Sequence, residues 1–211
     1  MEREFEARRF NLQNLNPDVL DFVKSNALRI DGGEVTDGDI RLMSGIIESA
    51  KKIGPVVCNF EENRGLDGFV LAVSKKKANK EDPSYPVMFS YLGDTKSPTE
   101  YTIENNLKIL AIKQNPEFTS SAKVDGGALL FKNNWIISVS GFAKPSMNTV
   151  VTLGIAFGTK LIQYDDAIKR AREEGMECLD LFVKYADRLT GPFLPRLNSR
   201  DDIYEEPHSN I

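Results

Sequence analysis

The sequence predicts an α+β fold in which a mostly antiparallel sheet of about five strands carries packed helices. Two observations lead to this prediction. Short runs of apolar and β-branched residues follow one another as hairpins, and a hairpin pairs its strands antiparallel. Longer segments between these runs repeat apolar residues at helical spacing. The chain has 211 residues, 41% hydrophobic and 27% charged, which is enough to bury one core.

Helical spacing predicts helices over 17–28, from Thr36 or Asp39 to Ile53, from Ser97 to about Asn115, and over 165–189. Gly54-Pro55 is expected to end the second of these helices. Ser97-Pro98-Thr99-Glu100 matches a capping box with proline at the first helical position. The helix that follows should have one apolar face, made of Ile103, Leu107, Leu110 and Ala111. Gly175 marks a break in the last helix, and 148–161 fits either a strand or a helix.

Apolar and β-branched runs predict the strands, at 56–60, 69–73, 85–92, 127–131 and 135–141. Asn133-Asn134 should form the turn of the last hairpin, because asparagine tolerates positive φ angles. The charged segment 75–84 is expected to be an exposed loop. We therefore expect one α+β domain over 17–190, between an N-terminal arm (1–16) and a polar, acidic tail (191–211).

Composition and charge argue against several functions. The formal net charge is −4, and a mildly acidic chain is a poor binder of nucleic acid or of a membrane surface. The start of the chain lacks the apolar region of a secretory signal, and no apolar run is long enough to span a membrane, so we expect a cytoplasmic protein. The single histidine, His208, lies in the tail, which disfavours a histidine-based triad or metal site.

The remaining candidates for catalysis are weak, so no catalytic or metal-binding residue is assigned. Cys58 and Cys178 lie in apolar runs, where a free cysteine behaves as a small buried hydrophobe. Glu61 and Glu62 are adjacent, and on a strand such neighbours point to opposite sides. An enzyme that uses Cys58 or Asp125 stays open as the least favoured alternative.

The apolar hairpin between Asp125 and Phe142 is the candidate binding region. Its glycines would let a ligand or another backbone approach closely, and it holds the single tryptophan. The predicted ligand-binding residues are Gly126, Gly127, Trp135, Ser140 and Gly141. The alternative is that this hairpin is only the core of the sheet.

The same hairpin resembles a family pattern. Gly126-Gly127-Ala128-Leu129-Leu130, a two-residue turn and then Ile136 to Gly141 resemble the "GG-apolar-turn-apolar-V-S-G" stretch of the GlcG/HbpS-like family. This resemblance covers about 40–161 and implies a profilin-like layout, frequent oligomerisation and a link to haem or corrinoid binding. The histidine that some members offer to haem iron has no counterpart here. Met43, Met88, Met147, a cysteine or a tyrosine would have to take its place.

Two functions from different classes follow from these observations. The first is a non-enzymatic domain that binds a small apolar ligand or acts as a sensor, with a pocket bounded by the 126–141 hairpin and the helix that begins at Ser97. Haem or a related ligand belongs to this hypothesis, although no cofactor is assigned. The alternative is a structural subunit, a homo-oligomer that self-assembles through its terminal arms and the apolar hairpin.

Overall fold

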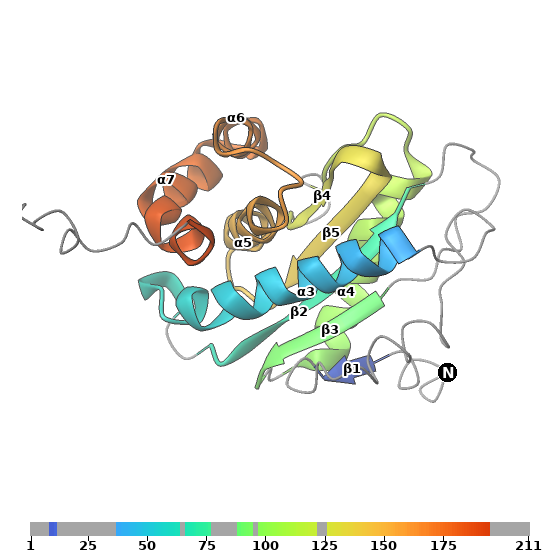
Figure 1. Ribbon diagram of the computed structural model, residues 1–211, viewed down its shortest axis with the longest axis horizontal. Helices are drawn as coiled ribbons and strands as arrows, with labels where there is room; N and C mark the ends of the chain where they lie inside the picture. Colours follow the sequence, from blue (N-terminus) through green and yellow to red (C-terminus); the bar gives the residue numbers. More distant parts are fainter. Residues whose placement is uncertain are drawn as a thin grey trace, which may run out of the picture.

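The computed structural model describes residues 9–11, 37–63, 66–76, 88–94, 97–121 and 126–194 (Figure 1). Its strands are β1 (Arg9–Asn11), β2 (Gly68–Lys75), β3 (Met88–Gly93), β4 (Ala128–Leu130) and β5 (Trp135–Ser140). Its helices are α3 (Asp37–Cys58), α4 (Pro98–Gln114), α5 (Pro145–Gly158), α6 (Tyr164–Glu174) and α7 (Met176–Thr190). The expected helix over 17–28, most of the N-terminal arm and the tail beyond residue 194 lie outside the described residues.

The sheet has the strand order β1-β3-β2-β5-β4. Each neighbouring pair among β3, β2, β5 and β4 is antiparallel, and the short β1 lies parallel to β3. The hairpin-based prediction of an α+β fold with a mostly antiparallel sheet is therefore confirmed.

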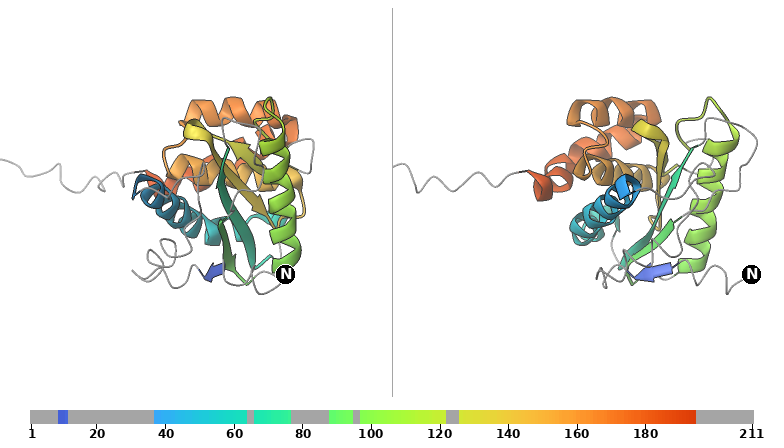
Figure 2. Two further views of the ribbon diagram at one scale, coloured as in Figure 1. Left: turned by 90° about the vertical axis from the view of Figure 1, so that its right-hand side faces the viewer. Right: turned by 45° about the vertical axis from the view of Figure 1, so that its right-hand side comes forward.

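Helices cover both faces of the sheet, but unequally. Figure 2 shows α4 standing alone on one face, while α3 and α5 lie on the other with α6 and α7 stacked behind them. The larger core lies on the side of α3 and α5, where Phe69, Leu71 and Val139 point. A smaller apolar cluster, which includes Val70 and Ile136, packs under α4. Alternate residues of β2 and β5 thus serve the two cores, as the pleat of a strand requires.

Several local predictions are confirmed by backbone geometry. Asn133 and Asn134 both have positive φ, 58° and 63°, at the turn between β4 and β5. Gly175, with φ 127°, separates α6 from α7. The ambiguous segment 148–161 is mostly helix, since α5 runs to Gly158 and buries nearly all of its side chains.

The predicted strand over 56–60 is wrong, because α3 continues through Gly54-Pro55 to Cys58. Ile53, Val57 and Phe60 are all buried, a spacing of four and three residues that places them on one side of a helical turn. Asn63 holds the end of the helix, since its Nδ2 donates to the carbonyl of Val57 at 2.7 Å. A proline near the end of a helix removes one N–H, and here the buried side chains around it outweigh that loss.

The expected apolar face of α4 is also wrong. Ile103 and Leu107 point to solvent, with exposed fractions of 52% and 55%. The buried face instead carries Thr102, Asn105, Lys108, Ile109 and Ile112. Polar partners on the sheet, described below, stabilise this inverted orientation. The predicted cap is absent as well: the Ser97 side chain makes no cap bond, and only its carbonyl accepts the N–H of Tyr101.

The start of the 75–84 segment is not the exposed loop that its charge predicts. Lys75 ends β2, and Lys76 is buried, with its Nζ donating to the carbonyls of Asn115, Pro116 and Phe118 at 2.9, 3.1 and 3.0 Å. Burial lowers the pKa of this lysine. Lys76 thereby fixes the chain just after α4, while residues 77–84 lie outside the described part.

Candidate functional site

Two of the predicted ligand-binding residues, Gly127 and Ser140, meet at one place under α4. Ser140 is the last residue of β5 and is fully buried. Lys108 Nζ donates to Ser140 Oγ at 3.1 Å, and a Cβ placed on Gly127 would lie 3.4 Å from the same Nζ. The hairpin and the helix that follows Ser97 are thus neighbours, as predicted.

A polar cluster joins α4 to the sheet at this place. Lys108 forms an ion pair with Glu104, one turn earlier, and its side chain is only 1% exposed. Ser140 Oγ lies 2.8 Å from Glu104 Oε1 and 3.1 Å from Asn105 Oδ1, one of which accepts its proton. Ser138 donates to Asn105 Oδ1 at 2.5 Å, and Asn105 Nδ2 donates to the carbonyl of Val70 at 3.0 Å.

The cluster has the chemistry of a structural network. The Lys108 side chain donates to both Glu104 and Ser140 and so links two members of the cluster. Ser140 is covered by α4 and is closed to a substrate. Buried polar groups that satisfy one another fix the relative position of the elements that carry them. We conclude that this cluster holds α4 in its inverted orientation on the sheet.

The glycines of the hairpin bring the chain itself into close contact. At Gly127, with φ +92°, a Cβ would lie 2.6 Å from the carbonyl oxygen of Val139 and 2.7 Å from Asn148 Cβ. At Gly126 and Gly141 the nearest atoms belong to Pro145 and Phe69, at 3.1 and 3.0 Å. The close approach expected of these glycines is therefore made by neighbouring strands and α5, as in the interpretation of the hairpin as sheet core.

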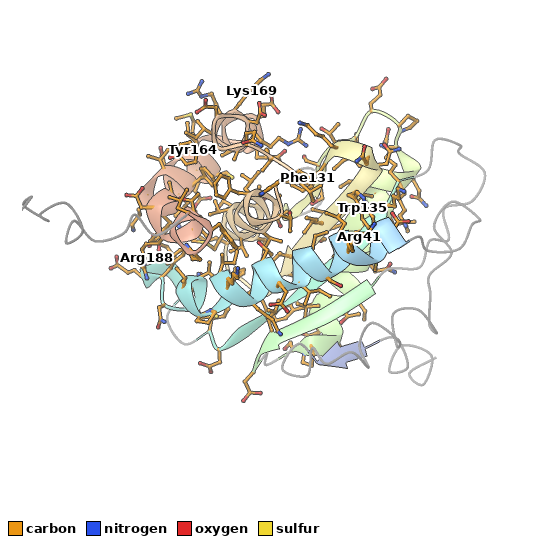
Figure 3. The ribbon with its side chains drawn as sticks, viewed as in Figure 1. Arg41, Phe131, Trp135, Tyr164, Lys169 and Arg188 are labelled. Atoms are coloured by element: carbon orange, nitrogen blue, oxygen red, sulfur yellow. The ribbon has the colours of Figure 1, made fainter. Side chains whose placement is uncertain are left out.

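Trp135 lies apart from the other predicted residues. It begins β5 and points to the opposite face from Ser140, beside the first turns of α3 (Figure 3). Lys75 Nζ lies 5.6 Å from the centroid of its ring and 3.6 Å from Asp39 of α3. As ligand contacts, the predicted residues remain a prediction; the structure places Trp135 elsewhere.

A pocket of about 290 Å³ lies between the second half of α3 and the paired ends of β2 and β3. Its lining residues are Lys51, Gly54, Pro55, Cys58, Asp67, Phe69, Leu92 and Gly93. The members from α3 recur at spacings of three and four, so they share one face of the helix. Phe69 and Leu92 pair across the two strands and supply apolar surface below that face.

Gly54 keeps this pocket open. A Cβ placed on Gly54 would meet Phe69 Cε1 at 3.8 Å and Leu92 Cδ2 at 4.0 Å, which are ordinary contacts, so any longer side chain would extend toward the space between them. The sequence does not predict this pocket, because Gly54-Pro55 is typical of the end of a helix. The available signal was the helical spacing of Ile53, Val57 and Phe60, which continues past the proline.

The two cysteines are poor nucleophiles. Burial, followed by the carboxylates of Glu174 and Glu177, raises the pKa of Cys178 to about 12. Burial and then the Asp67 carboxylate also raise the pKa of Cys58, the thiol that lines the pocket. A thiol needs a lowered pKa to react as a thiolate at neutral pH, so Cys58 offers an uncharged wall to the pocket. Asp125, the other open candidate, lies outside the described residues.

Glu61 and Glu62 share one partner, contrary to the prediction from strand geometry. They lie in a short 3-10 turn, Glu61–Asn63, and Lys184 Nζ of α7 is 3.9 Å from Glu61 and 2.7 Å from Glu62. The Tyr185 hydroxyl also donates to Glu62. Burial raises the pKa of Glu62, but the bonds from Lys184 and Tyr185 outweigh it and lower that pKa to about 2.

This lowered pKa predicts a loss of stability in acid. The unfolded chain takes up a proton on Glu62 near its ordinary pKa of 4.5, while the folded protein resists protonation down to about 2. The stabilising contribution is therefore present above that window and lost as the pH falls through it. Denaturant titrations measure the free energy of unfolding at each pH. As the pH falls through this window, the wild type should lose about 1 to 2 kcal/mol more of that free energy than Glu62→Gln does. Parallel curves for the two proteins would contradict the assignment.

Metal and haem ligands are scarce in the described part of the chain. Among its residues, no group of three or more His, Cys, Asp or Glu side chains is arranged to hold a metal ion. Met43 and Met147 are packed in the main core, and the side chain of Met88 is not described. These two methionines therefore do not fit the role of an axial haem ligand at the pocket. Within the same residues, no helix has both the length and the apolar character needed to cross a bilayer.

Comparison of the chain with protein-family models, with curated proteins and with solved structures gives no match.

Proposed function

We propose that this chain is a non-enzymatic ligand-binding or sensor-like domain that takes a small, largely apolar ligand in the pocket between α3 and the ends of β2 and β3. The observation that carries the proposal is the pocket itself, about 290 Å³, with Phe69, Leu92 and Pro55 in its walls. Ligand sites are concave and mostly apolar, with a few polar groups that fix orientation, and typically measure about 300–1,000 Å³. The pocket lies at the small end of that range.

The polar residues of the pocket suggest one further feature of the ligand. Lys51 already pairs with Glu48, with 3.3 Å between Nζ and Oε1. Asp67 has no ion-pair partner among the described residues. A ligand with one hydroxyl or amine donor and an apolar body suits this lining, with Asp67 as the acceptor.

The arrangement of the pocket also supports a sensor-like role. Its walls come from α3 on one side and from the β2 and β3 ends on the other. A ligand that binds only the folded state stabilises it by RT ln(1 + [L]/Kd), so a ligand held between the two elements would tie the helix to the sheet. As part of the same proposal, we infer the profilin-like layout of the resembling family. It is supported by the antiparallel sheet with α4 on one face and α3 and α5 on the other.

Filling the pocket tests the proposal. Gly54→Leu places a side chain above Phe69 and Leu92, and replacing glycine within a helix also favours helix formation. The probes are benzene, indole and hexanol, and ligand-observed NMR measures their binding. We expect them to bind the wild type, and their affinity for Gly54→Leu should be at least about tenfold lower. Gly45→Ala is the matched control, since at this position of α3 the Cβ would meet, of the described residues beyond its own helix, only Thr159 within 4.0 Å.

The outcomes separate the alternatives. Binding by the wild type and Gly45→Ala, lost in Gly54→Leu, supports the proposal. Absence of binding by all three probes, or equal binding by Gly54→Leu, overturns it. Haem is titrated in a separate arm. A stoichiometric change in its absorption spectrum that survives in Gly54→Leu would replace the small ligand with haem at another site.

The alternative function is a subunit that assembles through its arms and the apolar hairpin. The hairpin offers little exposed apolar surface for such assembly. Ile136, Ile137 and Val139 are fully buried. Of the two arms, only Arg9–Asn11 and Gly191–Leu194 fall within the described residues. No observation on those surfaces favours this function.

A further inference from the structure

The outward face of α4 carries an apolar stripe. Ile103 and Leu107 are among the most exposed large apolar residues of the described chain, and the half-buried Leu110 lies one turn further along the helix. With Glu100 and Gln114 at its ends, the stripe has positions 100, 103, 107, 110 and 114, alternating in steps of three and four. This is the a and d spacing of a helix that packs along another helix.

The stripe differs from scattered surface residues because the rest of the helix is arranged around it. Single exposed apolar residues are normal on a protein surface. Here, however, Asn105 and Lys108 are buried against the sheet beside Ile109 and Ile112, while Ile103 and Leu107 face outward. The Lys108–Ser140 and Asn105–Ser138 hydrogen bonds hold the helix in that orientation. Figure 2 shows that no other described helix lies on this side of the sheet.

The pattern of the stripe is complementary to itself in the antiparallel direction. If a second copy of α4 runs antiparallel with its centre at Leu107, then Leu107 meets its own counterpart and Ile103 lies beside Leu110 of the second copy. The same register sets Glu100 beside the uncharged Gln114, whereas a parallel pair would oppose two Glu100 carboxylates. Glu104, at the edge of the stripe, is already neutralised by Lys108 within its own chain. Antiparallel packing also aligns opposite ends of the two helix dipoles.

We propose that α4 is the contact helix of a symmetric dimer, in which its Ile103–Leu107–Leu110 face packs antiparallel against the same face of a second copy. Two-fold symmetry requires a self-complementary patch, which this stripe provides. The proposal is independent of the ligand pocket, which lies across the sheet from α4. Because the contact is only one helix long, its buried area lies toward the small end for specific interfaces. We therefore expect weak, concentration-dependent association.

Sedimentation equilibrium of the full chain, from about 1 µM to about 1 mM, tests the proposal. The wild type should pass from monomer to dimer, and Leu107→Glu should weaken association at least about tenfold, since symmetry brings two carboxylates together. Val183→Glu is the control, because Val183 of α7 is equally exposed, at 57%. Its association should equal that of the wild type. Leu107→Cys should form an intermolecular disulfide on oxidation in a Cys58→Ser background, and Val183→Cys should not.

Each remaining outcome overturns the proposal. A wild type that stays monomeric throughout shows that no second copy covers α4. Dimerisation that survives Leu107→Glu, or is lost equally in Val183→Glu, places the interface elsewhere. If Leu107→Glu lowers the melting temperature of the monomer, a segment of the same chain covers the stripe. Ile103→Lys repeats the test one turn away and should give the same loss of dimer.

Discussion

Gly127→Ala should destabilise the protein by about 3 to 5 kcal/mol. Gly127 has φ +92°, a backbone conformation that residues with a side chain rarely adopt. The added methyl group would lie 2.6 Å from the carbonyl oxygen of Val139 and 2.7 Å from Asn148 Cβ. Both neighbours belong to packed elements, so the backbone must shift to make room.

That shift would break bonds that join three elements. Gly127 N–H donates to Thr149 Oγ1 at 2.9 Å, and its carbonyl accepts from Thr152 Oγ1 at 2.7 Å and from Val139 N–H at 3.1 Å. Gly127 therefore ties the start of β4 to β5 and to α5. Urea unfolding of Gly127→Ala measures the loss, and the control is Gly191→Ala, where no described atom beyond the adjoining residues lies within 4 Å of the new Cβ. We expect the control to stay within about 0.5 kcal/mol of the wild type, and equal losses in the two variants would contradict the argument.

The features that the sequence predicts well are those that local backbone rules decide. Asn133-Asn134 is a turn because asparagine tolerates positive φ, and both residues have it. Gly175 separates two helices for a similar reason. The antiparallel pairing of β4 with β5 is equally local, since only residues 131–134 separate the two strands. None of these features needs knowledge of what lies across the fold.

The segment 148–161 shows where local preference stops deciding. Its valines and threonines favour a strand by propensity, yet α5 is a helix. Thr149 and Thr152 bond Gly127, and Val150 and Val151 are buried in the core. These partners are more than twenty residues away for both threonines, so sequence spacing within the segment cannot reveal them. Tertiary packing overrides a propensity difference of this size.

The orientation of α4 was unpredictable for the same reason. Apolar periodicity indicates that a helix has two faces, and the usual inference buries the apolar one. Opposite α4, the sheet carries Ser138 and Ser140. Their hydroxyl groups form hydrogen bonds with Asn105, Glu104 and Lys108. The complement on the sheet comes from residues more than thirty positions away. The pocket is equally hard to predict, because its lining comes from α3 and from the ends of two strands that lie elsewhere in the sequence.

Lys108→Met should lower the free energy of unfolding by about 2 to 3 kcal/mol. Methionine has a similar length but cannot donate, so Glu104 loses its ion pair and Ser140 Oγ loses a donor. Removing one partner of a fully buried pair typically costs about 3–5 kcal/mol. The cost is lower here because Glu104 is 30% exposed and regains contact with water.

An exposed lysine–glutamate pair provides the matched control. Lys144 and Glu177 also form an ion pair, with 3.0 Å between Nζ and Oε1, but both side chains are largely exposed. Lys144→Met should therefore cost no more than about 1 kcal/mol. Urea unfolding of both variants at neutral pH measures the difference, and comparable losses would show that burial does not strengthen the Lys108 contact.

A double-mutant cycle then shows whether the cluster acts as a unit. Glu104→Gln alone leaves the Lys108 ammonium buried without its counter-charge, which is expected to be the most damaging single change in the pair. Adding Lys108→Met removes that charge, so the double variant should be more stable than Glu104→Gln alone. The coupling free energy should reach about 1 to 3 kcal/mol, the range for residues that share one network. Additive losses would mean that Lys108 and Glu104 contribute separately, and that they do not act as one unit with the Asn105 hydrogen bonds to the sheet.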